Sequence, residues 1–116
     1  MDFGSGSLSA AGAGGMRLQY SPQAIGDLQK LQRYIAEILQ NPTAAKRTVR
    51  RILAECARLK EFPEMGCSIQ EKTGHATDLR MLICGNCLAV YRIQEETISV
   101  IRVLNARQDY IRILFG

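Results

Sequence analysis

The hydrophobic residues of the C-terminal third gather in three short runs separated by two polar pairs. The runs cover residues 79–84, 87–94 and 97–104, with Gly-Asn at 85–86 and Glu-Glu at 95–96 between them. Runs rich in Ile, Val, Leu and Tyr with two-residue breaks are typical of β-hairpins, and Gly-Asn supplies the positive φ angles that such turns need. The pattern therefore predicts a three-stranded antiparallel meander.

Upstream of the meander, the hydrophobic spacing becomes that of two amphipathic helices. Ser21-Pro22 and Asn41-Pro42 each combine a capping side chain with a proline that suits the first helical position, so each predicts a helix start. A stripe at helical spacing follows each cap. The first stripe is Ile25, Leu28, Leu31, Tyr34, Ile35, Ile38 and Leu39, and the second, ending near Lys60, is Ala45, Val49, Ile52, Cys56 and Leu59.

These elements predict one α+β domain spanning residues 16–116. A short edge strand at 16–20 comes first, then an antiparallel α-hairpin that packs on one face of the meander. A polar loop through about residue 77 joins the hairpin to the meander, and the tail at 110–115 docks back on the sheet. Residues 1–15 hold five Gly, three Ser and three Ala, and we interpret them as a flexible leader. A domain of this size has little material for a deep cavity, so we expect a surface site.

The two-residue turns also fix a register and assign the faces of the sheet. They place Arg80 opposite Tyr91 and Ala89 opposite Arg102. We expect the helices to cover the more apolar face, which carries Leu79, Met81, Ile83, Leu88, Val90, Ile101 and Val103. The opposite face carries Arg80, Tyr91 and Arg102, and we predict that it is the open, working surface.

Charge adds a candidate binding helix. Residues 16–116 carry 15 basic and 10 acidic side chains, a net charge of +5, because the remaining acid, Asp2, lies in the leader. Six of the basic residues fall in the second helix region, with Glu55 as the only acid there. An anionic partner, either nucleic acid or an acidic protein segment, would bind such a helix; a merely solvated face is the alternative. The candidate binding residues are Lys46, Arg47, Arg50 and Arg51.

The cysteines and the hydropathy limit the class of protein. Cys56, Cys67, Cys84 and Cys87 follow no disulfide framework, and no secretory leader precedes them, so we expect reduced thiols in a cytoplasmic protein. Cys84 and Cys87 have CxxC spacing, but a zinc site needs a second ligand pair, so we predict no metal and no cofactor. No run approaches the roughly 18 apolar residues of a membrane span.

Three segments resemble the RelE/ParE superfamily of bacterial type II toxin–antitoxin toxins. Residues 21–28 are similar to the opening of the first helix in that family, residues 85–93 to its central hairpin, and residues 101–110 to its last strand and the arginine-containing turn that follows. The likeness extends over residues 16–116 and agrees with the predicted order of elements. It implies a small cytoplasmic toxin that is kept inactive by a cognate antitoxin, whose C-terminal segment wraps the toxin.

The resemblance leaves the target open. RelE-like members cleave messenger RNA in the ribosomal A site without a metal, whereas ParE-like members poison DNA gyrase and are not nucleases. The strand arginine of the nucleases falls here at Leu88. Phosphodiester transfer needs a base, cations and an acid, so this loss favours the gyrase-directed, non-enzymatic reading. The alternatives are an mRNA endonuclease and an inactive relative that only binds its antitoxin.

Site residues follow from the same comparison. Arg107 matches the arginine after the last strand and Tyr110 its aromatic partner. Arg80 can substitute for the missing strand arginine, and His75, the only histidine, is a candidate acid or base. The candidate catalytic set is thus Arg80, Arg107, Tyr110 and His75. The candidate nucleic-acid or partner-binding set is Lys46, Arg47, Arg50, Arg51, Tyr91 and Arg102.

Overall fold

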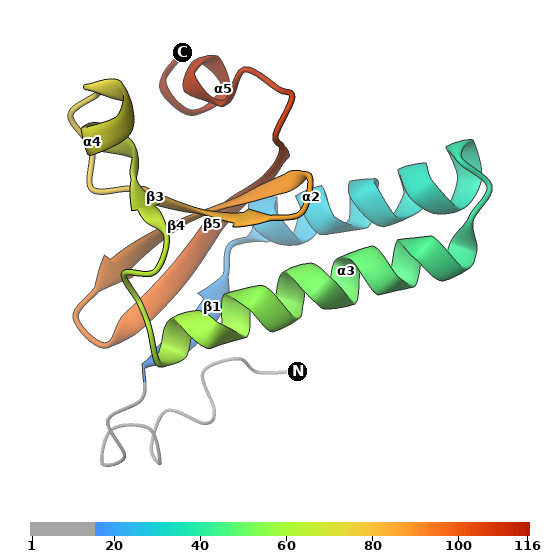
Figure 1. The fold of residues 1–116 in the computed structure, drawn as a ribbon, viewed down its shortest axis with the longest axis horizontal. Helices are drawn as coiled ribbons and strands as arrows, with labels where there is room; N and C mark the ends of the chain where they lie inside the picture. The colour runs from blue at the N-terminus through green and yellow to red at the C-terminus, as the bar shows by residue number, and fades with distance from the viewer. Residues whose placement is uncertain (1–15) are drawn as a thin grey trace.

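The fold is α+β, as predicted (Figure 1). The computed structural model describes residues 16–116, and the predicted leader lies outside the described residues. The elements in chain order are β1 (Arg17–Tyr20), α2 (Pro22–Arg33), the π-helical turn η1 (Tyr34–Ile38), α3 (Pro42–Ala57), the 3-10 turn η2 (Arg58–Lys60), β2 (Cys67–Ser68), α4 (Ile69–Thr73), β3 (Arg80–Cys84), β4 (Cys87–Gln94), β5 (Thr97–Asn105) and α5 (Tyr110–Phe115). None of the helices between residues 16 and 116 has the length and apolar character needed to cross a lipid bilayer.

The sheet has five strands in the order β1-β5-β4-β3-β2. The antiparallel meander β3-β4-β5 is confirmed, and the N-terminal strand β1 joins it in parallel beside β5. Gly85 has a φ of 63°, the left-handed conformation that the first central position of the β3–β4 turn requires. The two-residue strand β2 and the short helix α4 fall in the predicted loop. Elements this short show no hydrophobic period, so the sequence pattern could not indicate them.

Both helix starts are confirmed by their caps. The Ser21 hydroxyl accepts a hydrogen bond from the Ala24 amide, and the Asn41 side-chain oxygen accepts one from the Ala44 amide, each at 3.0 Å. The second stripe is also confirmed as the buried side of α3. The first stripe is wrong at its end, because Ile38 is 66% exposed. The π-helical turn changes the helical period there, and the tip of the α-hairpin extends past the sheet (Figure 1).

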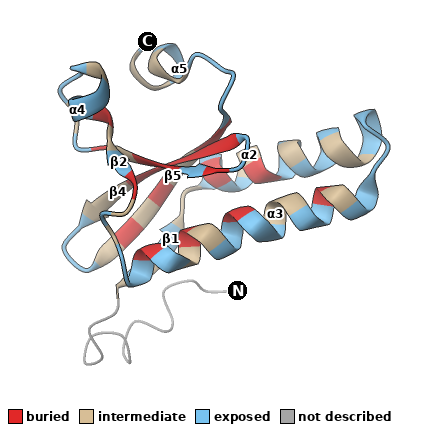
Figure 2. Cartoon of the chain, viewed as in Figure 1, coloured by how far each residue is buried: buried red, intermediate tan, exposed pale blue. Residues whose placement is uncertain are grey.

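The helices cover the face of the sheet that the sequence reading left open. Side chains of Leu82, Cys84, Cys87, Ala89 and Tyr91 share one buried cluster with α2 and α3. The predicted assignment of the covered face is therefore wrong. In Figure 2 the buried residues lie in the central strands and on the sides of α2 and α3 that face them. The opposite face is also apolar and packs against α4 and α5, which confirms that the C-terminal tail docks on the sheet.

A β-bulge also moves part of β5 out of its predicted register. Tyr91 lies opposite Val100, but Val90, and not the predicted Ala89, lies opposite Arg102, since the β4–β5 register shifts between Val90 and Tyr91. The extra residue reverses the alternation along β5 beyond the bulge, so Val103 lies on the helix-covered face while Leu79, Met81, Leu88 and Val90, which were predicted to share its face, lie on the far one. Both faces of the sheet are apolar, so alternation alone could not say which one the α-hairpin covers.

Candidate partner-binding groove

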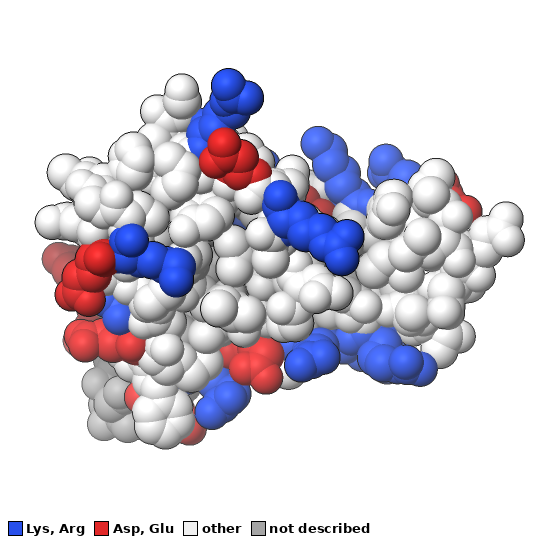
Figure 3. Space-filling model, turned by 45° about the horizontal axis from the view of Figure 1, so that its top comes forward, with Lys and Arg blue, Asp and Glu red and all other residues white. Residues whose placement is uncertain are grey.

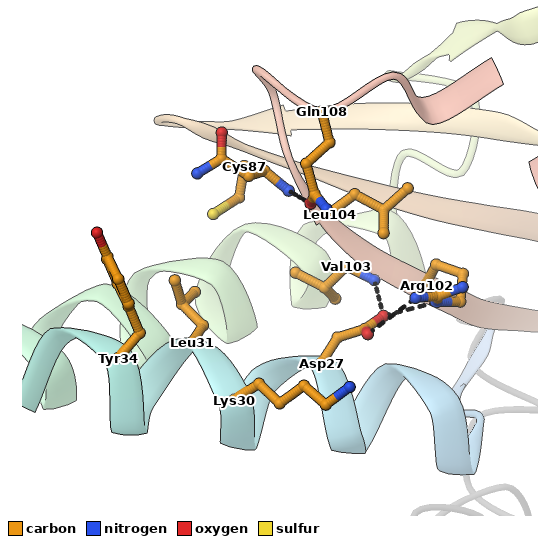
Figure 4. A pocket seen from close by; sticks show the side chains of 10 residues that line it. Asp27, Lys30, Leu31, Tyr34, Cys87, Arg102, Val103, Leu104 and Gln108 are labelled. Atoms are coloured by element: carbon orange, nitrogen blue, oxygen red, sulfur yellow. Dashed lines mark hydrogen bonds and ion pairs between the residues drawn. The ribbon is translucent and has the colours of Figure 1, made fainter. Parts of the chain in front are cut away.

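A groove runs between the α-hairpin and the end of the sheet nearest the β3–β4 turn. It consists of two adjoining hollows of about 450 and 430 Å³, which share Leu31, Tyr34, Cys87 and Asn105 as walls. Leu39 lines the hollow at the hairpin end, and Gln108 lines the other hollow. Figure 4 shows α2 side chains rising toward the sheet from below and Cys87, Leu104 and Gln108 facing them from above. The size of the groove and its apolar lining residues suit a peptide segment.

The charges on the groove walls are mostly basic. Lys30, Arg47 and Arg51 line it, and none of them forms an ion pair with another residue between 16 and 116. The lining carboxylate, Asp27, is already neutralised by Arg102. On the face in Figure 3, basic side chains gather over the helical half of the molecule and most acidic ones lie at the other end. The groove therefore presents a positive potential to a ligand.

Asp27 and Arg102 join α2 to β5 at the floor of the groove. The Arg102 guanidinium donates two hydrogen bonds to the Asp27 carboxylate, at 2.8 and 3.1 Å, and the Val103 amide donates a third at 2.9 Å (Figure 4). Hydrogen bonding to Asp27 raises the pKa of Arg102. Both side chains are only partly exposed, so this geometry positions α2 on the sheet. Arg102 was predicted to bind a partner protein or nucleic acid, but its guanidinium is paired with Asp27 inside the fold.

Tyr91 and Arg80 lie away from the groove and hold the turn that precedes β2. Tyr91 is fully buried; its hydroxyl donates to the Pro63 carbonyl at 2.7 Å and accepts from the Gly66 amide at 3.2 Å. Arg80 donates to the carbonyls of Glu64 and Gly66, at 3.1 and 2.6 Å. The predicted open surface of Arg80, Tyr91 and Arg102 does not exist, because helices α2 and α3 and the 62–66 turn occupy that side.

The other predicted catalytic residues gather at the far face of the sheet. His75 follows α4, and its ring stacks on Phe115 of α5 with centroids 4.8 Å apart. Tyr110 begins α5 and packs on the apolar cluster of that face. Arg107 is exposed in the turn between β5 and α5. The structure thus brings His75 and the helix of Tyr110 together, and leaves Arg80 bound elsewhere.

The basic residues of α3 divide into two pairs. Arg47 and Arg51 line the groove, whereas Lys46 and Arg50 are exposed on other sides of the helix. Sequence reasoning missed Asp27 and Lys30 as groove residues. Their position one helical turn apart, on the same helix as the predicted stripe, was the available signal. No group of His, Cys, Asp or Glu between residues 16 and 116 is arranged to hold a metal ion.

Comparison with known proteins identifies the family. Residues 18–110 match the family described as the ParE toxin of the type II toxin–antitoxin system parDE. The chain belongs to the ParE toxin family. It is therefore a toxin of a type II toxin–antitoxin system, as the resemblance of its sequence implied. No curated protein matches this ParE-family chain.

Solved structures confirm the fold of this ParE-family toxin. A chain of the chromosomal ParDE system from P. aeruginosa superposes with a TM-score of 0.68 at 19% identity, over 79% of this chain and 97% of that one. A chain of the toxin–antitoxin complex RelBE2 from Mycobacterium tuberculosis gives 0.53 at 18% identity, over 79% and 93%. A chain of the E. coli DinJ-YafQ complex gives 0.50 at 13% identity, over 87% and 98%. At these identities the likeness establishes the fold alone.

Proposed function

We propose that this toxin arrests growth by binding DNA gyrase, without cleaving RNA, and that a cognate antitoxin neutralises it. The observation that carries the proposal is that two sheet arginines, the candidate catalytic Arg80 and the candidate partner-binding Arg102, are already bound within the fold. The Arg80 guanidinium is bound to two backbone carbonyls and that of Arg102 to Asp27. Cations held in this way cannot move to stabilise charge on a scissile phosphate without breaking the fold.

The remaining candidates support the same conclusion. RNA cleavage needs a base, an acid and a cation around one phosphate. His75 presents its ring to Phe115, and Leu88 stands where the nucleases have an arginine. Arg107 and Tyr110 are the candidates that remain, Arg107 in the turn after β5 and Tyr110 at the start of α5. Two such residues support recognition of a target more than catalysis. We place the encounter with either target in the cytoplasm.

The groove is the proposed binding site for the antitoxin. Leu31, Tyr34 and Leu39 give the groove apolar side chains, and Lys30, Arg47 and Arg51 add positive charge that no residue between 16 and 116 pairs. An amphipathic antitoxin segment with carboxylates beside its apolar face is complementary to both features. The structural neighbours are themselves members of toxin–antitoxin complexes, which supports a protein partner.

Ribosome-dependent mRNA cleavage is the second candidate, and one observation favours it. His75 contacts α5, whose first residue is Tyr110, and Arg107 lies just before that helix. A candidate acid or base, an aromatic ring and a cation thus lie along the segments that meet at α5. This arrangement makes Arg107 and His75 the residues to test for catalysis. An inactive relative that only binds its antitoxin is the third outcome.

The deciding experiment induces the full chain in bacteria without antitoxin and follows growth, DNA synthesis and protein synthesis together. We expect DNA synthesis to fail first, and the purified toxin to inhibit supercoiling by gyrase in vitro. Early loss of protein synthesis with cleaved messages would instead identify the nuclease, and Arg107→Ala and His75→Ala should then relieve it. Normal growth with soluble protein would identify the inactive relative.

A further inference from the structure

The solvent side of α3 carries a cationic face that the groove uses only in part. This α3 cationic face consists of four exposed basic residues, Lys46, Arg47, Arg50 and Arg51. None of them forms an ion pair with a residue between 16 and 116. The acid that α3 contains, Glu55, already accepts a hydrogen bond from Arg58. Four positive charges on one helix are therefore available to a ligand.

Helical geometry arranges these four cations in two parallel rows. At 3.6 residues per turn they span an arc of about 140° on the side of α3 that is not buried. Lys46 and Arg50 form one row, Arg47 and Arg51 form the other, and the Cα atoms within a row are about 6 Å apart along the helix axis. Arg47 and Arg51 line the groove, whereas Lys46 and Arg50 do not. An antitoxin segment in the groove would leave this outer row uncovered.

The other residues of this face indicate the class of partner. Thr43, Ala54 and Ala57 fall within the same arc, and Leu53, which is 37% exposed, borders it. Protein interfaces depend on large aromatic or aliphatic anchors in well-packed pockets. A helix that lies on a membrane surface needs a broad apolar side opposite its cations. The α3 cationic face offers charge between small side chains, so it suits a ligand that is recognised by its charge.

A nucleic-acid duplex is such a ligand. Its phosphates are on the outside at a density of about one charge per 1.7 Å of axis, and cations that neutralise them release bound counterions. Single strands are instead bound by aromatic side chains that stack on the bases, and α3 contains no aromatic residue between Pro42 and Ala57. The helix lies at the outside of the fold (Figure 1), where a rigid duplex can reach it. These features favour a duplex over a single strand.

We propose that the α3 cationic face binds the phosphate backbone of duplex DNA without reading its base sequence. Lys46 and Arg50 serve this contact alone, and Arg47 and Arg51 contribute to it from the rim of the groove. The choice of DNA over RNA rests on the proposed action on DNA gyrase, because a toxin that contacts enzyme and DNA together is held at the site of action. An antitoxin that pairs with Arg47 and Arg51 removes two of the four contacts.

The test measures fluorescence anisotropy of a short labelled DNA duplex of mixed sequence with the full chain, from about 50 to 200 mM salt. Four phosphate contacts predict a slope of about −3.6 for the logarithm of the association constant against that of the salt concentration. Lys46→Gln and Arg50→Gln should each reduce the slope by about 0.9, and the double variant should give about −1.8. Arg112→Gln is the control, because Arg112 is exposed on α5 and forms no ion pair between residues 16 and 116.

Several results would overturn the proposal. They are no binding, a slope that the Lys46 and Arg50 substitutions leave unchanged, an equal change with Arg112→Gln, and tighter binding to a single strand or an RNA duplex of the same sequence. Displacement of the DNA by poly-L-glutamate at equal charge concentration would assign the face to an acidic protein segment instead. The slope of the unmodified chain needs no variant. Because gyrase is absent from the assay, a toxin that binds DNA but does not inhibit supercoiling would contradict the proposed function alone.

Discussion

The arginines of the sheet are bonded to groups inside the fold, whereas two arginines of α3 are not, although both sets were predicted to be functional residues. Arg80 and Arg102 each donate two hydrogen bonds to internal acceptors. Arg47 and Arg51 line the groove with no ion pair to any residue between 16 and 116. A cation that is paired inside the fold contributes to stability, and an unpaired one at a groove remains available to a partner. Substitutions that remove contacts of Arg80 or Arg102 should therefore lower stability, and substitutions of Arg47 or Arg51 should weaken binding of a partner.

The largest effect is expected at Gly66. Its carbonyl accepts a hydrogen bond from the Arg80 guanidinium, and its amide donates one to the Tyr91 hydroxyl. A Cβ at this position would lie 2.6 Å from the Met81 carbonyl oxygen and 2.7 Å from the Tyr91 hydroxyl. Gly66→Ala should lower the free energy of unfolding by about 3 kcal/mol, measured by urea denaturation. Gly26→Ala is the control, since nothing lies within 4 Å of its Cβ; it should stabilise α2 by about 0.5–1 kcal/mol. Equal stability of the two variants would contradict the role of the turn.

The next effect tests the ion pair under the groove. Asp27→Ala leaves the Arg102 guanidinium and the Val103 amide without their shared acceptor, so it should cost about 2 kcal/mol of unfolding free energy. The matched control is Asp78→Ala, because Asp78 also accepts from an arginine at 3.0 Å but is 62% exposed. It should cost at most about 1 kcal/mol. A similar loss from both would mean that the Asp27 pair does not anchor α2.

Binding, and not stability, should change at the groove walls. Arg47→Ala and Arg51→Ala should each weaken binding of the cognate antitoxin about tenfold at low salt, and less at high salt, because the lost interaction is electrostatic. Calorimetry at two salt concentrations measures both. Lys46→Ala and Arg50→Ala on the same helix, outside the groove, are the controls. Equal losses from all four would indicate a general charge effect instead of a binding groove.

The smallest effect is expected at the far face. His75→Ala removes the stacked partner of Phe115 and should destabilise the docking of α5 by at most about 1 kcal/mol. Hydrogen exchange of the α5 amides should become faster while exchange in β4 stays the same. Lys72→Ala, on the exposed side of α4, serves as the control. Unchanged exchange in α5 would show that Tyr110 and Leu114 hold the helix without His75.

Sequence alone determined the elements that local chemistry controls. Ser21 and Asn41 predicted both main helix starts because a capping side-chain oxygen followed by a proline favours a helix start through contacts within the first turn alone. The three apolar runs and the Gly-Asn turn predicted the meander for a similarly local reason. The order of these elements, together with the three segments at 21–28, 85–93 and 101–110, was sufficient to indicate the family.

Only the tertiary structure decided which face of the sheet is covered and which cations are free. Both faces are apolar, and the bulge between Val90 and Tyr91 reverses the alternation along β5, so the period of the sequence could not assign them. The partners of Arg80 and Arg102 come from segments distant in sequence, residues 64–66 and Asp27. A charge pairs with whatever the fold brings within hydrogen-bonding distance, and that distance is set by packing across the whole domain.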